Sequence, residues 1–150
     1  MDEPRWLSPS EQAAWRQLIA VVLKLPGTLE AQLRRDAGMT HFEYWVVALL
    51  SEAEDRRLRM SELASQAYAS LSRLSHVVTR LERRGLVRRE PSADDARGTE
   101  TVLTDEGYEH VLAAAPGHVE QVRRQVFDPL DARDVEDLTR IAGRIAARLP

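Results

Sequence analysis

Cysteine is absent from the 150 residues of this chain. Its absence excludes disulfide bonds, thiolate metal sites and oxidation sensors that depend on cysteine. The chain also lacks any run of about 18 apolar residues, the length that a membrane-spanning helix requires. Its first residues, MDEPRW, are polar and lean acidic, unlike the basic start of a signal peptide. We therefore expect a cytoplasmic protein with no membrane partner.

The common catalytic and metal-binding motifs are also missing. The histidines form no HExxH pattern, no glycine-rich phosphate-binding loop is present, and no serine has the context of a nucleophile elbow. His110 and His118 lie on either side of Pro116 and Gly117, and a bend between them is poor geometry for two ligands of one metal ion. We therefore expect neither an enzyme nor a metal or cofactor site.

Positive charge is in the minority, but it is concentrated. The net charge of the chain is −3 and its pI is about 5.8, which argues against non-specific binding to polyanions. Residues 56–104, however, contain ten arginines and six acids, a net charge of +4, whereas the rest of the chain carries −7. A basic region on an acidic body is the distribution expected when one face of a protein meets nucleic acid.

Residues 70–84 have the pattern of an amphipathic helix within this basic region. Its predicted apolar face consists of Leu71, Leu74, Val78 and Leu81. The opposite face has hydrogen-bond donors and cations but no acid; it consists of Ser72, Arg73, His76, Thr79, Arg80 and Arg83. Such a face suits phosphates and base edges. Gly85, which can adopt a positive φ, is expected to end the helix.

The residues that follow predict a β-hairpin. Residues 86–90 and 99–104 are short and compatible with strands, and the turn-forming stretch 91–98 lies between them. Arg97 falls at the tip, where a protruding arginine suits the narrow, negative minor groove of DNA. We expect Asp94 or Asp95 to pair with Arg97 and hold it extended.

Capping patterns place the helices before the hairpin. A capping box at Ser8 starts a long helix that we expect to be kinked or broken near Pro26. A second box at Thr40 starts the helix expected to be the central packing helix, to about residue 53. Residues 58–60 suit a short strand. Ser61 is expected to cap a short helix that leads through a turn into residues 70–84, giving a helix-turn-helix.

The C-terminal third is also predicted to be helical. Thr104 is expected to cap a long helix that is kinked at Pro116, and Asp131 a last amphipathic helix. The helices at both ends of the chain have more apolar surface than one small core requires. This excess favours a dimer built from intertwined terminal helices.

Motifs at four places resemble the multiple-antibiotic-resistance regulator (MarR) family of transcription factors. They are Ser70-x-Ser72, the run RLERRGLV at 80–87, DDAR at 94–97 and LTDEG at 103–107. The resemblance implies a mainly α fold with a small β-wing, in which the single domain 1–150 comprises a winged helix-turn-helix lobe at 40–103 and a dimerisation region formed by 1–36 and 104–150. It also implies a homodimer that binds an inverted repeat in double-stranded DNA, as a ligand-responsive repressor. The absence of cysteine excludes the peroxide sensing that some members use.

The resemblance also assigns roles to individual residues. Ser70 would cap its helix and give the first amides to a phosphate, Arg73 would contact guanine, and Arg80 would hold a phosphate. His76 departs from the arginine often found there. The full predicted DNA-binding set is Ser61, Ser70, Ser72, Arg73, Ser75, His76, Thr79, Arg80 and Arg97. Simple solvation is the alternative for Ser75 and Thr79, and it is favoured for Arg83, Arg84, Arg88 and Arg89.

Members of this family often bind small aromatic acids or phenols between the dimerisation helices and the winged lobe. The residues expected to line such a site here are Trp15, His41, Tyr44 and Trp45. The alternatives are ordinary core packing for Trp45 and simple exposure for His41. A second alternative concerns the whole domain, which could be a winged-helix module that contacts protein rather than DNA. Salt separates the two functions, because only DNA binding weakens steeply as salt rises.

Overall fold

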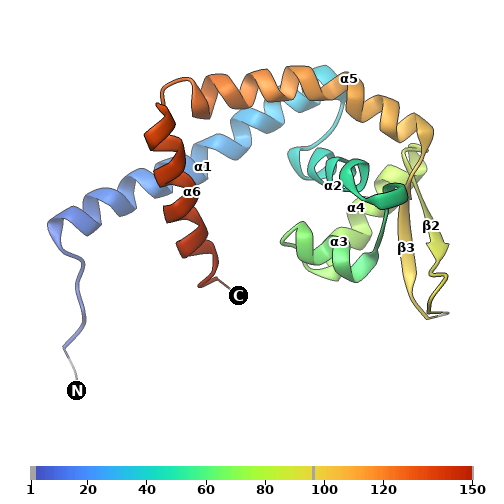
Figure 1. The fold of residues 1–150 in the computed structure, drawn as a ribbon, viewed down its shortest axis with the longest axis horizontal. Helices are drawn as coiled ribbons and strands as arrows, with labels where there is room; N and C mark the ends of the chain where they lie inside the picture. The colour runs from blue at the N-terminus through green and yellow to red at the C-terminus, as the bar shows by residue number, and fades with distance from the viewer. Residues whose placement is uncertain (1–2, 96, 150) are drawn as a thin grey trace.

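The computed structural model describes residues 3–95 and 97–149, and it confirms a mainly helical fold with one small sheet (Figure 1). The helices are α1 Pro9–Ala37, α2 His41–Glu52, α3 Met60–Gln66, α4 Leu71–Arg83, α5 Asp105–Val122 and α6 Ala132–Ala146. A 3-10 turn, η1, spans Glu54–Arg56, and a π-helical turn, η2, spans Arg123–Phe127. The strands are β1 Arg57–Arg59, β2 Val87–Pro91 and β3 Thr99–Leu103. Within the described residues, no helix has both the length and the apolar character needed to cross a bilayer.

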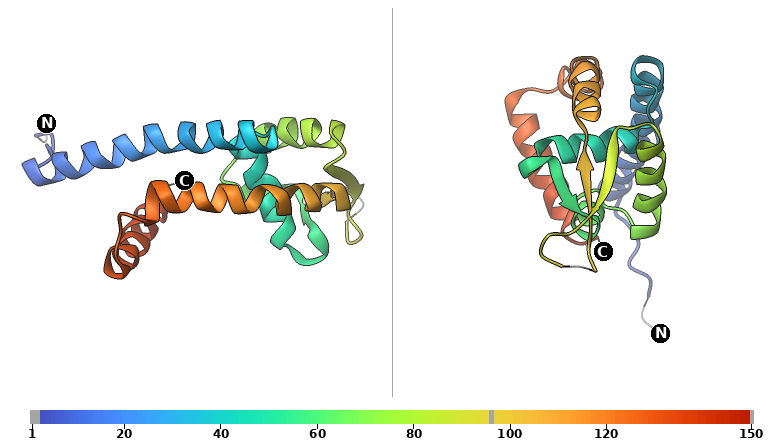
Figure 2. Two further views of the ribbon diagram at one scale, coloured as in Figure 1. Left: turned by 90° about the horizontal axis from the view of Figure 1, so that it is seen from above. Right: turned by 90° about the vertical axis from the view of Figure 1, so that its right-hand side faces the viewer.

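Two long helices, α1 and α5, lie side by side, and α2, α3, α4 and the sheet form a lobe at one end of them (Figures 1 and 2). Leu29 and Leu33 of α1 and Val111 and Ala114 of α5 are buried where the two helices meet the lobe. The other end of α1 is exposed, and α6, which turns away from the end of α5, has no buried residue. The terminal helices therefore have a core only beside the lobe.

The two prolines do not break their helices. Of the two alternatives near Pro26, a kink or a break, the structure excludes the break, because the 29-residue helix α1 runs through Pro26 from Pro9 to Ala37. Helix α5 likewise continues through Pro116. A proline removes one backbone donor, so a carbonyl one turn earlier loses its partner. Both prolines are exposed, where water reaches such a carbonyl. The cost of each proline is thereby reduced.

The core of the lobe lies between α2 and α4. Val46, Val47 and Leu50 of α2 are fully buried, and so are Leu74 and Leu81 of α4.

Two helices, α4 and α3, differ in detail from the sequence-based assignment. In α4 the buried face is formed by Leu74, Val77, Val78 and Leu81, whereas Leu71, at the first position of the helix, is 55% exposed. Leu71 is exposed because it is the first residue of α4, and burial in the core begins one turn later, at Leu74.

Ser61 does not cap α3, contrary to prediction. The helix begins at Met60, two residues before the start that a cap at Ser61 would give, and its N-cap is Arg59, which makes no side-chain capping bond. Arg59 is also the last residue of β1 and pairs with Glu100 of β3, so the strand leads directly into the helix. The position of the strand therefore sets the start of α3.

The sheet has the order β1-β3-β2, and both pairs are antiparallel. We call β2, β3 and the loop between them the wing. Its base is locked to α5, because the Thr104 hydroxyl donates to the Gly85 carbonyl at 2.7 Å and accepts from the Gly107 amide at 3.0 Å. A side chain at Gly107 would overlap the Leu86 carbonyl. The LTDEG motif therefore fixes the wing against α5.

Candidate nucleic-acid interface

The solvent face of α4 presents donors at the N-terminal end of the helix. The Ser70 hydroxyl accepts from the Arg73 amide at 3.2 Å, so the predicted N-cap is confirmed. Ser72, Arg73 and His76 are exposed on the first two turns. The Arg73 guanidinium lies over the Phe42 ring of α2, 4.1 Å from its centroid. This cation–π contact holds the guanidinium of Arg73 against α2.

Arg80, predicted to hold a phosphate, is paired with Glu43 of α2. Its Nε donates to Glu43 Oε1 at 3.0 Å, while Glu43 Oε2 accepts from the Thr40 amide at 2.8 Å. Burial by itself raises the pKa of Glu43, but the hydrogen bond from Thr40 and the guanidinium of Arg80 outweigh it, and the pKa is lowered. Arg80 is still half exposed, which leaves the outer edge of the guanidinium accessible.

Arg89 of β2 lies across α4, which the sequence did not indicate. Its guanidinium donates to Glu82 Oε2 at 2.8 Å, to the Ser75 carbonyl at 2.9 Å and to the Thr79 hydroxyl at 3.0 Å. The Thr79 hydroxyl in turn donates to the Ser75 carbonyl at 2.9 Å. The interpretation of Arg89 as part of a solvated charge run is therefore wrong. Ser75 and Thr79, predicted as DNA contacts, take part in the junction between α4 and the wing.

The tip of the wing carries Arg97 exposed, as expected. The carboxylates beside it have other partners in the described part of the chain. Asp95 accepts from the backbone amide of Arg97 at 3.0 Å, and Asp94 lies 3.8 Å from the guanidinium of Arg59. Ala96, the third residue of the DDAR motif, lies outside the described residues. The aspartates therefore shape the loop instead of pairing with the Arg97 side chain. Ser61 is exposed in the first turn of α3.

A cleft of about 410 Å³ separates the lobe from α1 and α5. It is lined by Leu29, His41, Phe42, Trp45, Arg73, His118 and Val122. Two residues predicted for a ligand site, His41 and Trp45, are thus brought together. Trp45 is 39% exposed there, so core packing within the monomer does not account for it. The structure adds Arg73 to the lining of this cleft, and Arg73 lies on α4, the helix that carries most of the predicted DNA contacts.

The other two predicted ligand residues lie elsewhere. Tyr44 is buried behind the cleft, with its ring centroid 4.5 Å from that of His118. Trp15 is exposed on α1, and the helix rises about 21 Å between it and Leu29, so one chain does not bring Trp15 to the cleft. Sequence reasoning missed His118, because only packing of α5 against α2 brings it opposite His41.

The histidines of the cleft face each other with ring centroids 5.8 Å apart. Burial lowers the pKa of His41, although the carboxylate of Glu30 opposes the change. Burial and the charge of His41 lower the pKa of His118, whose Nδ1 lies 3.4 Å from the Gln32 side-chain oxygen. Both rings are therefore biased toward the neutral form, and an anion between them would reverse that bias.

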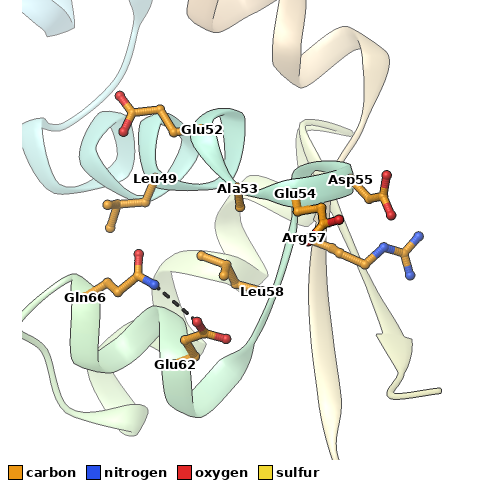
Figure 3. Close-up of a pocket in the computed structure, with 9 residues that line it drawn as sticks. All are labelled: Leu49, Glu52, Ala53, Glu54, Asp55, Arg57, Leu58, Glu62 and Gln66. Carbon is orange, nitrogen blue, oxygen red and sulfur yellow. Dashed lines mark hydrogen bonds between the residues drawn. The ribbon is translucent and has the colours of Figure 1, made fainter. Parts of the chain in front are cut away.

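A second cleft, of about 590 Å³, lies at the end of α2, beside η1, β1 and α3 (Figure 3). Its charged lining is mostly acidic and consists of Glu52, Glu54, Asp55, Arg57 and Glu62. The Gln66 side chain donates to Glu62 at 3.3 Å within it. Clustered carboxylates repel phosphate, so this cleft contrasts with the arginine-bearing face of α4.

Comparison with known proteins agrees with the four motifs. A model of the MarR family matches residues 39–99. The fold is similar to that of Sco3205, a MarR family transcriptional regulator from Streptomyces coelicolor solved in complex with DNA, with 49% identity, a TM-score of 0.93 and coverage of 97% of this chain and 91% of that one. It is also similar to AbsC, a MarR family regulator from the same organism, with 41% identity, a TM-score of 0.88 and coverage of 97% and 100%.

The HTH-type transcriptional repressor YetL of Bacillus subtilis is 28% identical over 112 residues, which make up 75% of this chain and 66% of that protein. The similarity to Sco3205 and AbsC extends across both the lobe and the terminal helices, since it covers 97% of the chain at 49% and 41% identity. The chain therefore belongs to the MarR family of transcriptional regulators.

Proposed function

We propose that the protein is a sequence-specific DNA-binding repressor that binds an inverted-repeat operator as a homodimer. The observation that carries the proposal is the exposed face of α4, on which Ser72, Arg73 and His76 lie and in which no residue from 71 to 81 is acidic. The 49% identity to Sco3205, which was solved bound to DNA, supports the same assignment. The family consists of transcriptional regulators and not of enzymes.

Each exposed group has a role in this proposal. Arg73 contacts guanine, for which a bidentate pair contributes about 1–3 kcal/mol of discrimination. Ser70 and the first amides of α4 receive a phosphate, because a helix N-terminus is positive. Ser61 and Arg80 also contact the backbone, Arg80 through the guanidinium edge that Glu43 leaves open. Arg97 enters the minor groove. Ser75 and Thr79 hold Arg89 and do not read bases.

The apolar surface of the terminal helices supports the homodimer. Large hydrophobic side chains are exposed along α1, α5, η2 and α6; they are Trp15, Leu18, Val21, Val22, Leu23, Leu112, Val119, Phe127, Leu138, Ile141 and Ile145. We propose that a second copy of the chain covers this surface. Residues 1–36 and 104–150 of the two copies would form the interface, and residues 40–103 would remain free to bind DNA. A two-fold axis would place the two α4 helices about 34–36 Å apart, one turn of DNA.

Arg73 links the cleft beside Trp45, which we call the effector cleft, to the DNA-binding face, because it belongs to both. We propose that a small aromatic acid or phenol stacks on Trp45 and meets the polar atoms of His41 and His118. Arg73 lines the same cleft and lies on the Phe42 ring, so an acidic ligand would attract the guanidinium that DNA requires. Such a ligand relieves repression only to the extent that it prefers the protein without DNA.

Selection of bound duplexes from a random pool tests the function. We expect an enriched palindrome, and we expect its affinity to fall steeply between 50 and 200 mM salt, by about 10³-fold if six phosphates are contacted. Arg97→Ala should weaken binding to every duplex that contains the site. A pool that stays unenriched at low salt would overturn the proposal.

The alternative, a winged-helix module that contacts protein, has a different outcome. It predicts no enriched duplex and no steep dependence on salt. The solvent face of α4 favours DNA, because Ser, Arg and His donors match phosphates and base edges.

A further inference from the structure

We infer that Tyr68 and Leu71 form an apolar contact to the operator, in which Leu71 packs against a thymine methyl group and the Tyr68 hydroxyl donates to a flanking phosphate. The inference rests on the proposed function and adds to it one specificity residue, Leu71, and one phosphate contact, Tyr68. Neither residue belongs to the donor face predicted from the sequence. Tyr68 lies in the turn between α3 and α4, and Leu71 is the first residue of α4.

The exposure of these two side chains separates them from the rest of the lobe. Tyr68 is 88% exposed and Leu71 is 55% exposed. Among the described residues from 46 to 111, no other large hydrophobic side chain is exposed to this degree. The remaining exposed hydrophobics lie on the terminal segments proposed to dimerise or, as Trp45 does, in the effector cleft. Two exposed apolar side chains beside the donors at the N-terminal end of α4 therefore call for an occupant of their own.

The backbone at Tyr68 shows that the side chain is retained at a cost. Tyr68 has a φ of 52°, and its amide and that of Ala69 donate to the carbonyls of Ser65 and Ala64, which closes the end of α3. Glycine is the usual residue at this position of a helix end, because it has no side chain to clash. The same chain uses glycine for this purpose at Gly38 and Gly85, with φ of 63° and 74°. At the end of α3, by contrast, the position is occupied by Tyr68, whose side chain the rest of the chain leaves exposed.

The surroundings of the pair identify DNA as its occupant. Ser70, Ser72 and Arg73 flank Leu71 in sequence and present donors on the same end of α4. The major groove offers one apolar group among its donors and acceptors, which is the thymine methyl. An exposed leucine among donors matches that pattern. The phenol of Tyr68, two residues before the N-cap, suits the phosphate backbone that borders the groove.

Uracil substitution tests the Leu71 contact. Each thymine of a duplex selected by the wild-type protein is replaced in turn by deoxyuridine, which removes only the methyl group. We expect one position per half-site at which the wild-type protein loses about four-fold in affinity, as expected for one methyl group. Leu71→Ala should bind the thymine and uracil duplexes equally.

A uracil series without effect on the wild-type protein, or with the same effect on Leu71→Ala, would overturn the inference and leave the proposed function intact, because the selected duplex still binds. If selection yields no duplex, the proposed function itself fails. The salt dependence of Leu71→Ala should equal that of the wild type, since no phosphate contact is removed.

Replacement of Tyr68 provides a test in which stability and binding move in opposite directions. Tyr68→Gly removes the strain at positive φ, so we expect the melting temperature to rise by about 2–4 °C. The same variant should lose about ten-fold in affinity for the selected duplex, and Tyr68→Phe should lose a similar amount because it lacks only the hydroxyl. Unchanged binding by both variants would show that Tyr68 does not contact DNA.

Discussion

Arg89 of the wing and Glu82 of α4 are joined twice. The Arg89 amide donates to Glu82 Oε1 at 2.9 Å and its guanidinium to Glu82 Oε2 at 2.8 Å, while a further arm of the guanidinium reaches Ser75 and Thr79. The wing and α4 are therefore held at a defined angle. In the proposed DNA complex, this angle would determine whether Arg97 and Arg73 engage their grooves together.

Arg89→Met should weaken both folding and DNA binding. We expect about 1–2 kcal/mol less stability toward urea, because Glu82, Ser75 and Thr79 lose a shared donor. Affinity for the selected duplex should fall further, since the carboxylate of Glu82 is unmasked beside phosphates. Arg88→Met is the matched control. Arg88 is more exposed and, among the described residues, its side chain pairs with Glu90 of its own strand, so its replacement should cost less than about 0.5 kcal/mol. Equal losses in the two variants would contradict the role of Arg89.

The Glu43–Arg80 pair predicts how stability depends on acid pH. Because the folded-state pKa of Glu43 is lowered, the stability it contributes is present above its unfolded pKa, about 4.3, and is lost as pH falls below that value. Glu43→Gln should therefore destabilise the protein at pH 7, and the difference from the wild type should shrink between about pH 4.5 and pH 3. Urea unfolding at several pH values measures this difference in the free energy of unfolding. A difference that is constant over this range would show that Glu43 contributes by packing alone.

The two cleft histidines predict a separate dependence near neutral pH. The pKa of His118 is lowered by burial and by His41, and that of His41 by burial, so the folded state binds fewer protons than the unfolded state. The stability they contribute is complete above an unfolded pKa of about 6.5 and is lost as pH falls below it. His118→Gln should flatten the loss between about pH 6.5 and pH 5. An unchanged slope in His118→Gln would contradict this account.

Gly107 predicts a large effect of a single methyl group. A Cβ at this position would overlap the Leu86 carbonyl, which is backbone and has little room to move. Gly107→Ala should cost about 3 kcal/mol or more, or prevent folding. Gly143→Ala in α6, where nothing lies within 4 Å, should instead be neutral or stabilising by up to about 1 kcal/mol. Thermal unfolding of the two variants measures the difference. Similar melting temperatures would contradict the claim that the Leu86 carbonyl leaves no room for a side chain at residue 107.

The proposed homodimer predicts that apolar contacts of α6 are required for DNA binding. Ile141→Arg places a charge on a helix that has no buried residue within one chain. The isolated fold should therefore tolerate the change, whereas a dimer interface should not. We expect a shift toward monomer in sedimentation velocity, together with a loss of about 10²-fold or more in affinity for the selected palindrome. Thr139→Arg, exposed on the same helix, controls for the added charge.

The sequence alone was sufficient for the local elements. Capping boxes at Ser8, Thr40 and Asp131 and the N-caps at Ser70 and Thr104 lie where the patterns predict them. Each depends on a contact between residues three apart, so no knowledge of the rest of the fold is needed. The same holds for Gly85 at the end of α4, since glycine adopts a positive φ without the steric clash that a side chain causes.

Contacts between distant elements were decided only by the tertiary structure. Arg80 pairs with Glu43 and His118 faces His41 because α4 and α5 pack against α2, and the sequence contains many other acids that an arginine equally favours. The exposure of Leu71 has the same origin, because helical periodicity places a residue on a face but does not show where along the helix the core begins. Charge and periodicity are local properties, whereas the choice of partner depends on which surfaces packing brings together.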